Sequence, residues 1–206
     1  MTDMYRAIAT RLAEKVSYAA APVGRTHATV ALILREAIED LEVLFIERAH
    51  HERDPWSGHL AFPGGKVESG EQTYETAVRE TREEIGIDLA EASCLGRLSD
   101  IIGSNLPVRV SCHVFGFGPA VPVPRVGDEV RDVFWVPVRD LCDPGRHVTA
   151  QVGFSGGLHA VPAISLPVSD KPVLWGITYR LVMQFLGITG RMKVLEVADE
   201  SYQGTL

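Results

Sequence analysis

A central amphipathic pattern lies between a glycine-rich stretch and a single glycine. From about Gln72 onward, apolar or small residues recur every three or four positions, which is typical of a helix that packs one face on a core. Gly86 follows the last of them and is expected to end the helix as its C-terminal cap. The members of the stripe are Tyr74, Ala77, Val78, Thr81 and Ile85.

Two strands are predicted before this helix and two after it. Residues 28–35 form a continuous apolar run, typical of a strand that is buried on both faces. Residues 42–48 are rich in β-branched and aromatic side chains, which favour a strand. After the helix, 95–101 and 108–116 have strand patterns, and a turn is expected at 103–107.

The two ends of the chain add further helices and strands. Residues 1–21 carry an apolar stripe among charged residues and predict a packing helix. Residues 129–141 predict a strand followed by a short helix near Arg139, and 147–168 alternate enough for a hairpin or a meandering pair of strands. The last helix is expected to open within 167–186. Its packing stripe consists of Trp175, Thr178, Leu181, Val182, Phe185 and Leu186.

Length and composition indicate one globular domain. The 206 residues, 46% hydrophobic and 23% charged, suit a single domain over 1–206. This domain has a helical extension at 1–25 and a tail at 187–206 that adds a strand at 192–197.

Neither a membrane span nor a signal peptide is recognisable, so the chain is expected in the cytoplasm. Three widely spaced cysteines give neither a disulfide framework nor a zinc pattern. A net charge of -7 argues against a nucleic-acid binder, which needs a basic face.

Three glutamates project from neighbouring positions of the central helix. Glu80, Glu83 and Glu84 stand at i, i+3 and i+4, and two carboxylates 4 Å apart repel each other by roughly 1 kcal/mol in water. A positive charge is therefore expected among them. One interpretation is a solvated helix face on which Arg79 and Arg82 neutralise the acids. The other is a divalent metal ion, because Mg²⁺ prefers carboxylate oxygens together with substrate phosphates.

The spacing around these glutamates resembles the Nudix box. Gly65 is followed after five residues by Glu71 and after seven more by Arg79, which opens the run Arg-Glu-Thr-Arg-Glu-Glu-Ile-Gly-Ile. The one departure is Thr81, at a position where the family has an aliphatic residue. A motif with so many fixed positions is much more specific than a lone glycine fingerprint.

The resemblance implies an α/β fold, the Nudix α/β/α sandwich with a mixed β-sheet, and a hydrolase that uses Mg²⁺ or Mn²⁺. Glu80, Glu83 and Glu84 would be metal ligands and catalytic residues, with one of them serving as general base. The loop would offer a backbone carbonyl to the metal from Gly65 or from its neighbour Gly64.

Two further residues would have a structural role by the same resemblance. Glu71 and Arg79 are similar to the family's ion pair that braces the loop against the helix. We therefore expect Glu71 and Arg79 to hold the loop in place and to take no part in the chemistry.

Two other stretches resemble the coenzyme A pyrophosphatase branch of the family. Arg48 and Arg53 precede Gly58 and the run Phe-Pro-Gly-Gly at 62–65, with one residue more between Arg53 and Gly58 than that branch has. Far downstream, Trp175-Gly-Ile-Thr is similar to the start of the branch's closing helix. The implied substrate is coenzyme A or acyl-coenzyme A, with ADP-ribose, a nucleotide sugar or another nucleotide as alternatives.

The substrate-binding candidates share a position near the loop or ahead of a strand; they are Arg48, Arg53, Gly64 and Glu129. For Glu129 an ordinary surface position is the alternative, and Trp56 is either a buried anchor or part of a substrate loop. The expected partner is a small phosphoanhydride, without nucleic acid or membrane, and a homodimer is left open. Two other classes stay open: a nucleotide-sensing Nudix module without catalysis, and an acidic helix whose spacing is coincidental.

Overall fold

The structure is a computed structural model that describes residues 1–15, 25–51, 56–103, 107–118, 120–154 and 157–192. Seven strands form one mixed sheet: β1 (Thr26–Glu36), β2 (Leu41–Arg48), β3 (Leu60–Ala61), β4 (Gly64–Lys66), β5 (Ser93–Ile102), β6 (Val108–Phe117) and β7 (Val130–Pro137). The order is β3-β2-β1-β6-β5, with β4 paired to β1 and β7 to β2. β1 and β6 run parallel and all other pairs of this sheet are antiparallel, so the predicted mixed sheet is confirmed.

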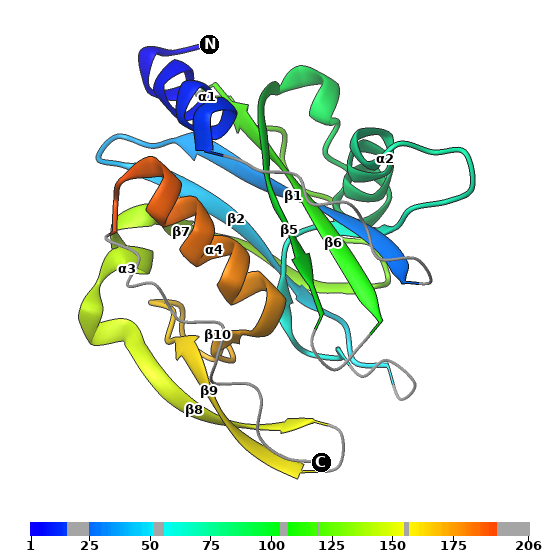
Figure 1. Ribbon diagram of the computed structural model, residues 1–206, viewed down its shortest axis with the longest axis vertical. Coiled ribbons are helices and arrows are strands. Elements are labelled where there is room, and N and C mark those ends of the chain that lie inside the picture. Colours follow the sequence, from blue (N-terminus) through cyan, green and yellow to red (C-terminus); the bar gives the residue numbers. More distant parts are fainter. Residues whose placement is uncertain (16–24, 52–55, 104–106, 119, 155–156, 193–206) are drawn as a thin grey trace.

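Helices cover both faces of this sheet (Figure 1). Their bounds are α1 (Asp3–Lys15), α2 (Thr73–Ile85), α3 (Val138–Cys142) and α4 (Gly176–Thr189). Side chains alternate along β1, so Ala31 and Ile33 belong to a buried cluster with Ala77 of α2, whereas Leu32 and Leu34 belong to a second cluster that includes α1 and α4. The predicted α/β/α architecture is confirmed.

The N-terminal helix is part of the core. Tyr5, Ile8 and Leu12 are almost fully buried, and the Tyr5 hydroxyl donates a hydrogen bond of 2.7 Å to the carbonyl of Phe117. A Cβ on Gly116 would lie 2.8 Å from the Tyr5 ring, so the glycine lets α1 approach β6 closely. The predicted helix is present up to Lys15, and 16–21 lie outside the described residues. None of the helices in the described ranges is long and apolar enough to span a membrane.

A second, smaller sheet follows the first. β8 (His147–Phe154) and β9 (Gly157–Ile164) form the predicted hairpin, and β10 (Leu174–Trp175) pairs with the end of β9. The expectation that Trp175 lies in the packing stripe of the last helix is wrong. Trp175 belongs to β10, where it pairs with Ala163, and α4 begins only at Gly176. The strand predicted at 192–197 lies outside the described residues beyond Met192.

Candidate active site

The catalytic-helix candidate α2 has a defined start and end. The backbone N–H of Gln72 donates to the carboxylate of Glu75 at 2.9 Å, which satisfies one free group before the first turn. At the other end Gly86 takes a left-handed conformation (φ 67°) and donates its N–H to the carbonyl of Arg82, as predicted for a C-terminal cap. These caps fix which residues α2 presents to the sheet.

The buried face of α2 differs in two respects from the predicted stripe. Tyr74 is 41% exposed, so its prediction as a core residue is wrong; its ring lies at the margin of the sheet, with centroids 5.8 Å from His113 and Phe115. Two polar residues that the stripe omitted, Thr76 and Glu84, are buried. The stripe members that are buried are Ala77, Thr81 and Ile85.

The glycine loop lies directly against the α2 carboxylates. The backbone N–H of Gly64 donates to Oε2 of Glu84 at 2.9 Å. A Cβ on Gly64 would lie 2.1 Å from the carbonyl oxygen of Thr29, and a Cβ on Gly65 would lie 2.3 Å from the carboxylate of Glu80. A side chain at Gly64 would collide with the backbone of β1, so only glycine fits there, whereas a side chain at Gly65 would displace the Glu80 carboxylate from its present position.

Arg79 connects the loop to the other carboxylates. Its Nε and Nη2 donate to the two carboxylate oxygens of Glu71 at 2.9 and 3.0 Å, and its Nη1 donates to Glu80 at 2.9 Å and Glu83 at 3.0 Å. The hydrogen bond from Arg79, with a further one from Thr76, lowers the pKa of Glu71 to about 2. The predicted ion pair is therefore present, and Arg79 also neutralises part of the acidic cluster.

Glu84 is the least compensated carboxylate of this cluster. It is 6% exposed, and burial raises its pKa to about 7, assisted by the negative charges of Glu80 and Glu129. The N–H of Gly64 and the positive charge of Arg48 act in the opposite direction. Burial also raises the pKa of Glu80. A buried carboxylate that stays short of positive charge is costly unless another cation binds beside it.

The structure brings most of the predicted substrate residues to this place. Arg48 and Glu129 both lie near enough to Glu84 for their charges to affect its pKa, and Glu129 is exposed. The carbonyl of Glu129 accepts the N–H of Ala49 at 2.9 Å, which ties the start of β7 to the end of β2. Arg53 lies outside the described residues.

The same carboxylates are the donor set that a divalent cation would require. Over the described part of the chain, no three His, Cys, Asp or Glu side chains are already arranged to hold a metal ion. The reason is visible in the contacts, because Glu80 and Glu83 point to Arg79 and Glu84 points to Gly64. Their oxygens nevertheless come from adjacent turns of one helix, beside a loop without side chains, and they are hard ligands of the type Mg²⁺ prefers. The residues therefore fit such an ion.

An aromatic cluster beside the loop was missed by the sequence reasoning. The ring of His59 makes edge-to-face contacts with Trp175, at a centroid distance of 4.9 Å, and with Trp56, at 5.9 Å. The carbonyl of His59 accepts the N–H of Arg48 at 3.0 Å. The motif at Trp175 marked that residue, but no signal in the sequence connects it with His59.

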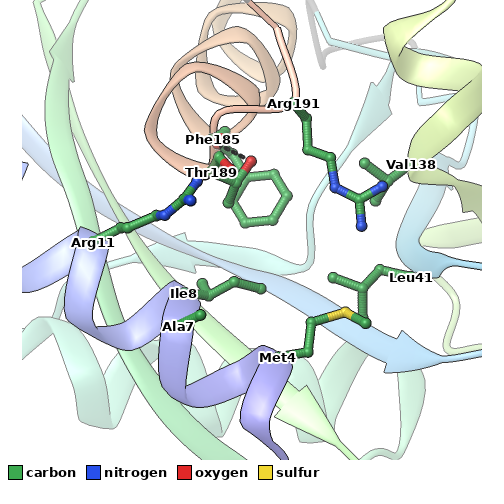
Figure 2. Close-up of a pocket in the computed structure, with 9 residues that line it drawn as sticks. All are labelled: Met4, Ala7, Ile8, Arg11, Leu41, Val138, Phe185, Thr189 and Arg191. Atoms are coloured by element: carbon green, nitrogen blue, oxygen red, sulfur yellow. Dashed lines mark hydrogen bonds between the residues drawn. The ribbon is translucent and has the colours of Figure 1, made fainter.

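A cavity of about 140 Å³ lies away from these carboxylates, between α1 and α4 (Figure 2). Its lining is mostly aliphatic and aromatic, with Ile8 and Phe185 among its residues and the guanidinium groups of Arg11 and Arg191 at its sides. Arg191 pairs with Asp40 at 2.8 Å. Because no described carboxylate lines this cavity, the α2 cluster is the better candidate for hydrolytic chemistry.

Comparison with known proteins matches the same region. Residues 25–154 match the family model described as the NUDIX domain. An uncharacterised protein of Schizosaccharomyces pombe is 36% identical over 124 residues, which are 56% of this chain and 38% of that protein. Nudix hydrolase 3 of Caenorhabditis elegans is 34% identical over 102 residues, 48% of this chain and 42% of that protein. The uncharacterised Nudix hydrolase NudL of Yersinia pestis is 29% identical over 142 residues, 68% of each chain.

This chain matches only part of the length of two of these relatives. The matched part of this chain spans about two fifths of the S. pombe and C. elegans proteins. The crystal structure of a MutT/nudix family protein from Enterococcus faecalis is similar with a TM-score of 0.52 and 19% identity, covering 84% of this chain and 70% of that chain. That similarity concerns the fold.

Proposed function

This chain belongs to the Nudix hydrolase family, and we propose that it is a metal-dependent pyrophosphohydrolase that cleaves the diphosphate between a nucleoside and another moiety. The observation that carries the proposal is the pair of neighbouring carboxylates Glu84, which is buried, and Glu80, which is half-buried, packed against Gly64 and Gly65. A merely structural acidic helix has no reason to bury Glu84 beside a second, half-buried carboxylate. A nucleotide sensor without catalysis has no need of them either.

The residues that would hold the cation are Glu80, Glu83 and Glu84, with a backbone carbonyl of the glycine loop. Mg²⁺ or Mn²⁺ bound there would offset phosphate charge and lower the pKa of a bound water. One of the glutamates accepts the proton of the attacking water. Arg79 holds Glu80 and Glu83 in place through Nη1, and its bidentate pair with Glu71 fixes the guanidinium itself.

For the substrate we favour coenzyme A or an acyl-coenzyme A. The support is spatial: the two stretches that resemble the coenzyme A branch, far apart in sequence, lie in contact where the ring of Trp175 meets that of His59. The same segment joins Arg48 to the loop through the hydrogen bond to His59. Arg48 is then suited to the diphosphate, because its charge already acts on Glu84.

ADP-ribose, a nucleotide sugar and other nucleoside diphosphate derivatives are the alternatives. They lack the 3′-phosphate of coenzyme A, for which Arg53 is the proposed partner. A charge-assisted hydrogen bond of this type is worth roughly 1.5 to 3 kcal/mol, or about ten- to a hundredfold in discrimination.

The test is a hydrolysis screen with Mg²⁺ and with Mn²⁺ over coenzyme A, 3′-dephospho-coenzyme A, ADP-ribose, nucleotide sugars, diadenosine polyphosphates and nucleoside triphosphates. We expect activity that a chelator abolishes, and a preference for coenzyme A over its 3′-dephosphorylated form of about ten- to a hundredfold that Arg53→Ala removes. Equal rates on the two, or faster turnover of ADP-ribose, would assign the enzyme to the nucleoside-diphosphate branch. No hydrolysis of any substrate with either metal would reject the enzymatic proposal.

A further inference from the structure

The hairpin of β8 and β9 extends beyond the main sheet (Figure 1). The two strands pair along their whole length, from His147 with Ile164 to Phe154 with Gly157. Among the hairpin side chains whose burial the structure describes, only Val161, Ala163 and Ile164 at the end of β9 are buried, at 3% exposure or less, whereas residues 157–160 are exposed. An isolated two-stranded ribbon is marginally stable in water at best. The outer part of this hairpin is therefore expected to have a partner.

One edge of the hairpin is open for pairing. β8 is the last strand of the order β10-β9-β8, so within the described structure its outer backbone groups pair with no further strand. Proteins commonly protect such edges with charged side chains. Residues 147–164 contain no Lys, Arg, Asp or Glu, in a chain of which 23% is charged. Apolar side chains are exposed instead, including Val148 at 39% and Leu158 at 76%.

The absence of charge favours a second copy of this chain as the partner. In an antiparallel pair related by a twofold axis, a residue at the centre of the strand lies opposite its own copy, so a charge there would meet a like charge. β8 avoids this penalty. The whole chain has a net charge of -7, so two copies repel each other in general. If two copies meet through an uncharged hairpin that extends from the body, their charged bodies stay apart. Salt then screens much of the repulsion between the bodies, because the Debye length is about 8 Å at physiological salt.

We propose that the chain self-associates through this hairpin, with β8 of one copy pairing antiparallel to β8 of a second copy about a twofold axis near Gln151. The pairing extends each three-stranded sheet into a continuous six-stranded one. Exposed apolar side chains of the two hairpins then come together on either side of the axis. A partner selected by charge would find nothing to recognise on this surface.

The test uses charge at the predicted axis and sedimentation equilibrium up to about 100 µM, where association at micromolar affinity is measurable. The wild-type protein should approach twice its mass of 22.5 kDa. Gln151→Lys and Gln151→Glu should each raise the dissociation constant of the dimer by at least about tenfold, because like charges then face each other. An equimolar mixture of the two variants should recover association, since Lys now faces Glu.

A matched control is Ile38→Lys, which adds the same charge at a fully exposed side chain of the β1–β2 connection and should leave association unchanged. Circular dichroism checks that each variant is folded, and neither position belongs to the α2 site. A wild-type protein that stays monomeric over this range overturns the proposal. So does a dimer that both Gln151 variants leave intact, or a mixture of folded variants that fails to recover association. None of these outcomes bears on the hydrolase proposal.

Discussion

Two glutamates are almost equally buried in this molecule but are compensated in different ways. Glu47 in β2 is 3% exposed and accepts hydrogen bonds of 2.8 Å from both Arg131 and Lys171. Glu84 in α2 is 6% exposed and accepts the backbone N–H of Gly64, and burial raises its pKa to about 7. The first carboxylate has two cationic partners, whereas the second has acidic neighbours.

From this difference we propose that Glu47 serves the structure and Glu84 the chemistry. A buried carboxylate whose charge is fully paired contributes to the stability of the surrounding fold. Removing it leaves its cationic partners unpaired. A buried carboxylate that is short of positive charge reduces stability, and is expected where a further cation binds. Burial by itself therefore does not identify the site; the balance of charge around the buried group does.

The largest expected effect follows from removing the charge of Glu84. Glu84→Gln should lower the hydrolysis rate by about 10³-fold or more, because a metal ligand or general base is lost, and Glu80→Gln should act similarly. The free energy of unfolding of Glu84→Gln should be equal to that of wild type or higher, since a poorly compensated buried charge is gone. Steady-state rates and urea titration measure the two quantities. Near-native rates in both variants would show that the chemistry lies elsewhere.

The converse variant is Glu47→Gln. It should lower the free energy of unfolding by about 3 kcal/mol, because Lys171 and Arg131 lose a buried anionic partner. Its rate per folded molecule should stay within a factor of a few of wild type, since Glu47 is not among the α2 carboxylates. Urea titration measures the free energy of unfolding, and an enzyme assay corrected for the folded fraction measures the rate per folded molecule. A loss of activity in a fully folded variant would contradict the division between the two glutamates.

A smaller effect should appear in both properties when the brace is removed. Glu71→Ala leaves Arg79 without its bidentate partner and should reduce the free energy of unfolding by about 2 kcal/mol at neutral pH. Activity should fall as well, because Arg79 holds Glu80 and Glu83.

The pKa of Glu71 is lowered to about 2. The stabilisation by this carboxylate is therefore present above its ordinary pKa of 4.5 and is lost as the pH falls from there through about 2. The difference between wild type and variant should shrink over that window; a constant difference would show that the pair is not ionic.

The α2 site was predictable because its information is local. Glu80, Glu83 and Glu84 share one helix, so their spacing predicts that they lie close together, and the resemblance to the Nudix box implies that Gly65 and the Glu71–Arg79 pair join them. The burial of Glu84 was not predictable in this way. It depends on the depth at which α2 packs on β1 and on the loop that folds over it.

The Glu47 network shows what sequence spacing cannot reveal. Lys171 is separated from Glu47 by 124 positions and comes from the segment before β10, so their meeting depends on how the small sheet packs beside β2. β3 and β4 were likewise missed, since β3 has two residues and β4 has three, two of them glycines, which is too short for a strand pattern. Tyr74 was misassigned because periodicity marks the face of a helix but not where the core beneath it ends.

A third ionisable side chain extends the comparison, because it is buried in its neutral form. His113 of β6 is 8% exposed, its Nε2 lies 2.9 Å from the hydroxyl of Thr73, and burial, with a contribution from the charge of Arg97, lowers its pKa to about 4. The unfolded chain takes up the proton near the ordinary histidine pKa of 6.5 and the folded chain only near 4. Stability is therefore complete above 6.5 and declines as the pH falls through this window. Between pH 7.5 and 5.5 the contribution of His113 to the free energy of unfolding should fall by about 1 kcal/mol.

His113→Gln keeps a polar group beside Thr73 but does not titrate, so its urea midpoint should depend less on pH than that of wild type. The pKa of His27 is also lowered, but His27 is present in both proteins and cancels in the difference. Parallel pH profiles for the two proteins would mean that His113 is not held neutral by the fold.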